Sequence, residues 1–294
     1  MHVVKFPLLL TIRNANCIIE RCQAAIFSPD QEILFDLSNC AFSDPFAITF
    51  IVGAAKACIA RGHVVSYRPA LNKKLNEYLT SIGFYEWGKG RDGAMKYAHH
   101  QAELRHFNGL DPTYTSTIIN VLQSVLTMSQ GVKDSLHLSI NELMTNTFDH
   151  SETLEGCFVC AQSYTERGNV NICITDFGRG ILRALSSVPT YAHLTNSIDA
   201  IKLAIEEGVS SRVGKLAGLG LTHIHRFLKV NEGEIHIMSG DGWVHWNYKN
   251  GNGVAIWQKK LRIAFEGTIV NIIARADGEG LYILESEMRD EPIF

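Results

Sequence analysis

The chain has 294 residues, of which 46% are hydrophobic and 19% charged, so it is long enough for two domains and too apolar for a disordered tail. Its net charge of -3 gives no basic bias toward nucleic acid, and no apolar run approaches the roughly 18 residues of a membrane span. Seven scattered cysteines are typical of reduced thiols, so we expect a cytoplasmic protein.

The first hundred residues alternate predicted strands and helices, which indicates a small α/β domain. Apolar residues at steps of four predict its longer helix, and Gly62 is expected to end that helix. A polar, glycine-bearing stretch after Trp87 is interpreted as a hairpin and linker, so we place the first domain at 1–105. The predicted strands are 1–10, 33–37 and 63–67, and the predicted helices are 46–60 and 71–82.

Residues 106–294 are predicted to form a second domain of helices and strands. In the strand 170–175, apolar residues alternate with polar ones, which predicts a half-exposed strand. Cys157 and Cys160 form a CxxC pair, but in a strand they would face opposite sides, which disfavours a metal site. The predicted helices are 112–130, 132–150 and 221–232, with a helical region over 181–207, and the predicted strands are 157–164, 170–175, 234–239, 243–248, 254–262 and 268–274.

The predicted helix over 132–150 carries the first group of residues suited to chemistry. Glu142 and Asn146 are four residues apart and share one helical face, while apolar residues on another face can pack on a sheet. A carboxylate can orient a hydroxyl or water for attack on a phosphoryl group, and an amide oxygen suits Mg²⁺. A solvated helix face has a similar composition, so this pair alone leaves both interpretations open.

Two glycine-bearing segments follow. Residues 174–181 read ITDFGRGI at the end of a predicted strand, so Asp176 stands at the strand end, where a buried carboxylate can accept a hydrogen bond from an amine such as adenine N6–H. Residues 214–221 read GKLAGLGL before a predicted helix, and such a loop offers backbone N–H groups to an anion. Taken alone, the first segment is equally a turn, and the second does not match a P-loop.

Together and in this order, the three segments resemble the GHKL ATPases, the superfamily of histidine kinases, gyrase and anti-sigma-factor kinases. The resemblance covers about residues 112–275 and implies a Bergerat-type α/β sandwich that binds ATP with Mg²⁺. NELMTNTFDH (141–150) resembles the N box, DFGRGI (176–181) the DxGxG box, GLGL (218–221) the second glycine box and FEGT (265–268) the closing GT element.

The resemblance implies a role for each matching residue. Glu142 would be the general base, Asn146 the Mg²⁺ ligand and Asp176 the residue that holds adenine. The other nucleotide-binding positions would be Gly178, Gly180, Gly218, Gly220, Leu221 and Thr268.

The segment between Ile181 and Gly218 would be the ATP lid. Within it, Arg212 and Lys215 are candidates to meet the γ-phosphate. Two exposed cations on a loop are an equal alternative for this pair.

The first domain resembles the STAS domains, the family that includes antagonists of anti-sigma factors. The resemblance rests on hydrophobic pattern over about residues 5–86 and on the segment DLSNCAFSD, which ends at Asp44. In switchable STAS domains a Ser or Thr follows this Asp, whereas here Pro45 follows it. The usual phosphorylation position therefore carries no hydroxyl.

These resemblances imply an ATP-binding regulatory protein that hydrolyses Mg·ATP or transfers its γ-phosphate to a protein Ser or Thr, as in anti-sigma-factor signalling. The alternative is a switch in which ATP orders the lid and changes a partner-binding surface with little turnover. A scaffold with a decayed site ranks last, because the acid, the amide and the glycines are all present. We expect a protein partner, no nucleic acid and no membrane, and leave a homodimer open.

Overall fold

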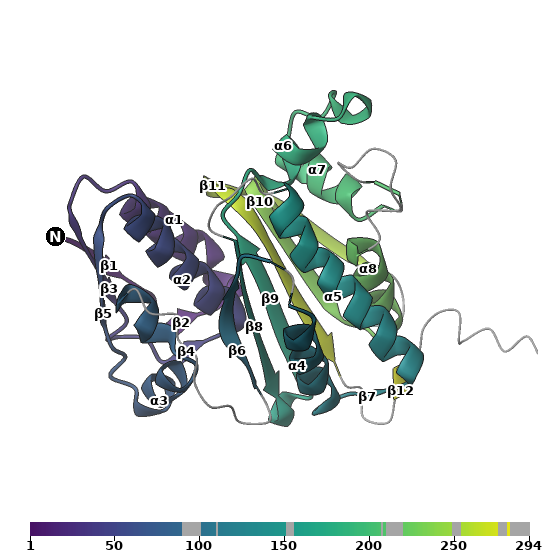
Figure 1. The fold of residues 1–294 in the computed structure, drawn as a ribbon, viewed down its shortest axis with the longest axis horizontal. Coiled ribbons are helices and arrows are strands. Elements are labelled where there is room, and N and C mark those ends of the chain that lie inside the picture. Colours follow the sequence, from purple (N-terminus) through teal and green to yellow (C-terminus); the bar gives the residue numbers. More distant parts are fainter. Residues whose placement is uncertain are drawn as a thin grey trace, which may run out of the picture.

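The computed structural model describes residues 1–89, 101–109, 111–150, 156–206, 208–209, 220–248, 254–275 and 281–282. These residues mix helices and strands, as expected for the α/β (α+β) class (Figure 1). A parallel sheet has the order β1-β3-β5, and an antiparallel sheet has the order β10-β11-β9-β8-β6. None of the helices in the described residues is long and apolar enough to cross a membrane.

The N-terminal part contains the parallel sheet, whose strands are close to the predicted ones. Helix α1 occupies a stretch for which the sequence interpretation gave no helix, although its buried residues have helical spacing. The elements are β1 (His2–Lys5), β2 (Leu9–Leu10), η1 (Ile12–Asn14), α1 (Ala15–Ile26), β3 (Glu32–Asp36), β4 (Phe42–Ser43), α2 (Pro45–Ala60), β5 (Val64–Arg68), α3 (Lys73–Ser81) and η2 (Phe84–Lys89).

Helix α2 confirms the predicted helix 46–60 to within one residue. The Asp44 carboxylate caps it by accepting a hydrogen bond from Ala47 N at 3.1 Å, and it also accepts from Ile12 N of η1 at 2.9 Å. Most of its residues are buried, including both aromatic rings. A helix that is apolar all round must be covered on all sides, and α2 lies between the two sheets (Figure 1).

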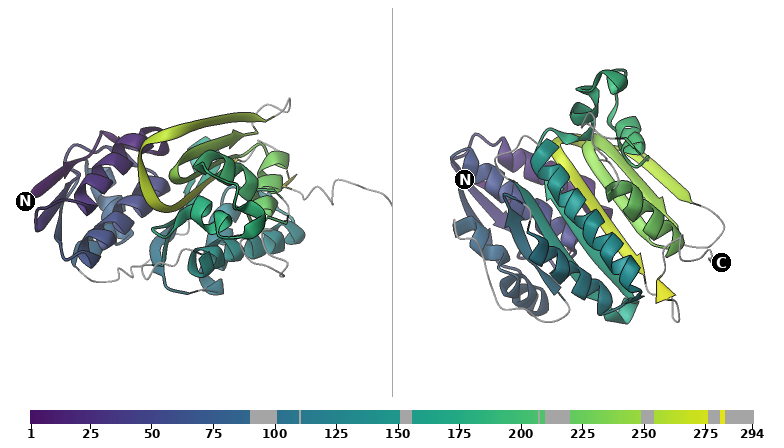
Figure 2. Two further views of the ribbon diagram at one scale, coloured as in Figure 1. Left: turned by 90° about the horizontal axis from the view of Figure 1, so that it is seen from above. Right: turned by 45° about the vertical axis from the view of Figure 1, so that its right-hand side comes forward.

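The C-terminal part is built on the antiparallel sheet. Figure 2 shows α4, α5 and α8 over one face of this sheet, while α1 and α2 cover the opposite face. The elements are β6 (Gln101–Phe107), α4 (Pro112–Gln123), β7 (Thr127–Met128), α5 (Gln130–His150), β8 (Cys157–Tyr164), η3 (Thr165–Arg167), β9 (Asn169–Asp176), α6 (Gly180–Ser186), η4 (Pro189–Tyr191), α7 (Ser197–Ala204), α8 (Gly220–Val230), β10 (Glu234–Asn247), β11 (Ala255–Arg275) and β12 (Leu281–Tyr282).

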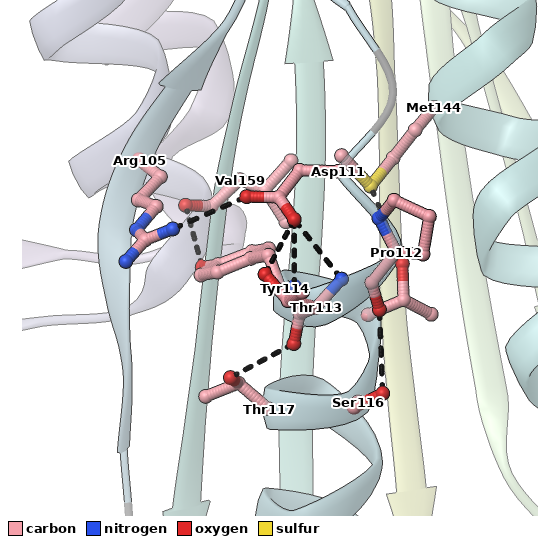
Figure 3. A network of polar contacts seen from close by, with 10 residues as sticks. Arg105, Asp111, Pro112, Thr113, Tyr114, Ser116, Thr117, Met144 and Val159 are labelled. Carbon is pink, nitrogen blue, oxygen red and sulfur yellow. Dashed lines mark hydrogen bonds and ion pairs between the residues drawn. The ribbon is translucent and has the colours of Figure 1, made fainter.

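Helix α4 is fixed to the sheet at its first turn (Figure 3). Asp111 caps the helix by accepting from Thr113 N at 3.0 Å, and it pairs with Arg105 of β6 at 3.4 Å. The Tyr114 hydroxyl donates to the carbonyl oxygen of Val159 in β8 at 3.3 Å. Strand β6 thus belongs to the larger sheet and runs across the position, near residue 105, where the sequence places the domain boundary.

Strand β10 turns back on itself near Gly240. Tyr248 N donates to Gly233 O at 3.0 Å, and the rings of His236 and His245 stack with centroids 3.8 Å apart, so its two halves lie side by side. The first half pairs with the end of β11 and the second half with its start. The four strands predicted after residue 233 are therefore present as two long elements that bend.

The prediction that strand 170–175 is half exposed is wrong. Every residue of β9 from Val170 to Asp176 is buried, because helices cover both faces of the sheet. The alternation instead separates two cores: Ile172 packs on the α5 side and Cys173 on the α2 side. The expectation for the CxxC pair is confirmed, since Cys157 and Cys160 lie in different cores as free thiols.

Candidate functional site

Asp176 ends β9 between two neighbouring strands, directly opposite Cys157 of β8 and Thr268 of β11. The side chain is 5% exposed and its Oδ1 accepts a hydrogen bond from Gly178 N at 2.8 Å. Burial raises the pKa of Asp176 to about 7, although hydrogen bonds from Gly178 and Thr268 act in the opposite direction. A carboxyl group held in this way is a strong acceptor for a ligand donor such as an amine.

Two glycines allow the chain to pass close to Asp176. Gly267 has φ +128°, and a Cβ there would lie 2.8 Å from the Asp176 carbonyl carbon and nearer still to its oxygen. Gly180 has φ +74°, and a Cβ there would lie 2.8 Å from Ser239 Oγ. Ser239 joins the two segments, because its hydroxyl donates to Gly267 O at 2.8 Å and accepts from Ile181 N at 2.9 Å.

Glu142 and Asn146 are both half-buried on α5, and their four-residue spacing places them on one face of this helix. Gly220, the first residue of α8, packs directly on this helix. A Cβ on Gly220 would lie 3.0 Å from Glu142 Cβ and 3.1 Å from Ser139 O. The structure therefore brings the predicted N box and the end of the predicted second glycine box together, although Glu142 and Gly220 are 78 positions apart in the sequence.

Helix α5 also reaches the strand end that carries Asp176. Thr147 hydrogen bonds to the Cys157 thiol, which is buried opposite Asp176 in the sheet. Asp176, Cys157 and Thr268 share the sheet face that α5 covers, because their alternating neighbours Ile174 and Val270 pack in the α5-side core. The carboxylate of β9 and the polar face of α5 thus belong to one side of one sheet.

The remaining predicted site residues are not placed by such contacts. Arg212, Lys215 and Gly218 lie outside the described residues. Leu221 is partly buried against the α5-side core. The described part of the predicted lid forms α6 and α7, and Thr222 Oγ1 of α8 donates to Ile205 O at 3.0 Å just beyond α7.

Sequence reasoning missed Ser239 and Thr147, which hold the site together. Ser239 ends the first half of β10, and a Ser before a Gly is so common in turns that it gives no signal. Thr147 lies in the segment that resembles the N box, but its bond to Cys157 depends on tertiary packing.

A cluster of potential metal ligands on the opposite sheet face does not fit a metal ion. Glu234, His236 and His245 place ligand atoms within 4.8 Å of one another. Arg275 already pairs with Glu234, and the two imidazole planes are parallel within 6°, so their lone pairs do not converge. Trp243 Nε1 donates to His236 Nδ1 at 3.3 Å, which leaves the proton on Nε2, the atom a metal would need.

The same residues are better explained as a partly buried polar network around the Glu234–Arg275 ion pair. Burial would raise the pKa of Glu234, but hydrogen bonds from His236 and His245 and the Arg275 guanidinium lower it well below its ordinary value. Burial lowers the pKa of His236 to about 4, so this ring is neutral near pH 7.

A pocket of about 580 Å³ lies where the N-terminal part meets α6. Its walls include Phe27, Arg61, Arg183, Glu266 and Gly180. Arg183 pairs with Glu266 at 3.5 Å, and the Arg61 guanidinium lies 5.0 Å from the Phe27 ring centre. These cations already have partners, so the pocket does not identify a ligand.

No family model and no curated protein matches this chain.

Proposed function

We propose that the chain binds ATP with Mg²⁺ in a GHKL-type site on the α5 side of the antiparallel sheet. The support is that Asp176 and Thr268 face the side of the sheet that α5 covers, and that Gly220 packs on α5, the helix that carries Glu142 and Asn146. On this proposal the C-terminal part is a Bergerat-type domain, and the N-terminal part is a STAS-like domain.

The observation that carries the proposal is the packing of Gly220 on Glu142. A glycine at the first turn of a helix leaves its backbone N–H groups accessible, and a helix N-terminus favours anions. A carboxylate beside it would repel a bound phosphate, unless it acts on the nucleophile or faces a cation. The adjacent Asn146, one helical turn further along α5, supplies an oxygen ligand suited to Mg²⁺.

Each residue then has a defined task. Asp176 accepts a hydrogen bond from the adenine amine, with Thr268 beside it. Glu142 orients the attacking water or hydroxyl and takes its proton. When bound, Mg·ATP supplies the γ-phosphoryl group, whose acceptor is water or a Ser or Thr of a protein partner.

A second candidate, a switch with little turnover, is favoured by one specific observation. The N-terminal part covers the back of the sheet that carries Asp176, and Thr49 Oγ1 lies 2.9 Å from Thr175 Oγ1. A change at the nucleotide site therefore has a direct route to a second domain.

Nucleotide binding is tested with Asp176→Asn and a matched control. Asp36→Asn also alters a buried carboxyl, but at the end of β3 in the parallel sheet. Wild type and Asp36→Asn are expected to bind Mg·ATP, whereas Asp176→Asn loses about 1.5–3 kcal/mol of binding free energy, the value of a charge-assisted hydrogen bond. Titration calorimetry measures the three Kd values, and no binding by wild type would refute the proposal.

A further inference from the structure

The two residues that flank Asp176 both contact α2. Thr49 and Thr175 share a hydrogen bond between their hydroxyls at 2.9 Å, and both side chains are fully buried. The Phe177 ring stacks on Phe50 with centroids 5.3 Å apart and planes at 27°. Neighbouring side chains of a strand point to opposite faces, so the alternation that directs Asp176 to the α5 side directs Thr175 to α2.

Gly53 makes the contact with Phe177 a close fit. A Cβ at Gly53 would lie 2.9 Å from Cδ2 and Cζ of the Phe177 ring and closer still to Cε2. The ring therefore lies against the backbone of α2. Gly in a helix interior is less favourable than Ala, and here the ring gives a steric reason for it.

Aromatic contacts also link α2 and Phe177 to the two strands that flank Asp176. Phe265 meets Phe50 edge to face at 5.4 Å, and it lies two residues before Gly267, which passes Asp176. Phe158 of β8 lies at right angles to Phe177 with centroids 6.3 Å apart. A displacement of α2 would therefore move both chain segments that enclose Asp176.

We propose that α2 positions the Asp176–Gly178 turn, with Gly53 and Phe177 as the positioning residues, so that docking of the N-terminal part and adenine-nucleotide binding are coupled. This inference rests on the proposed nucleotide site. Because coupling between two sites is reciprocal, nucleotide also favours the docked arrangement of α2.

The test is a double-mutant cycle on ATP affinity. Gly53→Ala displaces the Phe177 ring and is expected to weaken Mg·ATP binding about 5- to 30-fold, within the usual range of coupling between sites. Phe177→Ala removes the ring, so adding Gly53→Ala to it is expected to change the Kd less than twofold. Ala60→Gly, at the exposed end of α2, is the matched control and leaves the Kd unchanged. Circular dichroism confirms that each variant is folded at the assay temperature.

The outcomes separate the two proposals. If wild type binds no ATP, the proposed function fails and the coupling fails with it. If wild type binds ATP and folded Gly53→Ala binds equally well, or is impaired equally with and without the Phe177 ring, the coupling is refuted and the nucleotide site stands. If Gly53→Ala does not fold, Thr49→Val decides: it removes the bond to Thr175 with little change of shape, and an unchanged Kd refutes the coupling.

Discussion

Glu142 and Asn146 lie on one face of α5 but have different proposed tasks, so their variants should fail differently. Glu142→Ala should retain ATP affinity and lose about 10²- to 10⁴-fold in turnover, the usual contribution of a general base. Asn146→Ala should lose the part of the affinity that depends on Mg²⁺, because one oxygen ligand is missing. Equilibrium binding with and without Mg²⁺ and single-turnover hydrolysis measure both effects.

The matched control is Asp134→Ala, which removes an exposed acid from the same helix. It should change neither affinity nor turnover. Hydrolysis by Glu142→Ala at the wild-type rate would remove Glu142 from catalysis and leave only a nucleotide-binding role for the site. A Glu142→Ala variant that still signals to a partner would favour the switch over the enzyme.

The two buried carboxyls, Asp44 and Asp176, predict how stability depends on pH. Burial raises the pKa of each to about 7 in the folded state, above the ordinary value of 3.8. Between these values the folded chain holds protons that the unfolded chain has lost. The free energy of unfolding should therefore fall as the pH rises from about 4 to above 7.

Urea titrations between pH 5 and 8 measure this dependence without any ligand. Asp44→Asn and Asp176→Asn should each flatten the profile, and the double variant should flatten it further. A profile that is the same in all four proteins would show that neither carboxyl holds its proton in the folded state.

At the scale of elements, the start of α8 depends on the absence of a side chain. A Cβ on Gly220 would meet the backbone oxygen of Ser139, which cannot turn away as a side chain can. We expect Gly220→Ala to shift α8 from α5, to reduce the free energy of unfolding by about 1 kcal/mol, as overpacking does, and to weaken ATP binding. Gly109→Ala, where no atom lies within 4 Å, is the control. Equal ATP affinities for the two variants would show that Gly220 is not part of the nucleotide site.

The elements also show how far the sequence could predict the fold. The spacing of apolar residues identified α2 and α5 nearly to the residue, because such periodicity is a local property. Helix α1 had the same kind of signal, with Ile18, Ile19, Cys22 and Ala25 buried on one face. The exposure of β9 could not be predicted, because α2, more than 100 residues away in sequence, covers its second face.

In the candidate site, too, some residues could be predicted from the sequence and others could not. Asp176, Glu142 and Gly220 belong to short segments that resemble known motifs, so they could be selected from the sequence. Gly53 and Thr49 belong to an apolar helix with no motif, and their contacts with the site arise only from tertiary packing.

At the scale of the molecule, the N-terminal part and the larger sheet share one core. Phe46 and Phe50 of α2 belong to the same buried cluster as Phe158, Cys173 and Ile269. Separate unfolding of either part would expose this apolar surface. We therefore expect a single calorimetric transition whose van't Hoff and calorimetric enthalpies agree. Two resolved transitions, or a soluble and folded fragment of residues 106–294, would contradict a shared core.

Two cysteines lie in the core beneath α2, and their reactivity can report when this core opens. Cys160 and Cys173 are fully buried, Thr49 Oγ1 lies 3.3 Å from Cys173 Sγ, and burial raises the pKa of both thiols. A thiol reagent attacks the thiolate, so neither cysteine should react while α2 is docked. Their alkylation rate would then measure how often the N-terminal part separates from the antiparallel sheet. Cys157 lies in the same strand as Cys160 but is buried on the other face of the sheet. Its alkylation rate, measured in the same sample, would report global unfolding.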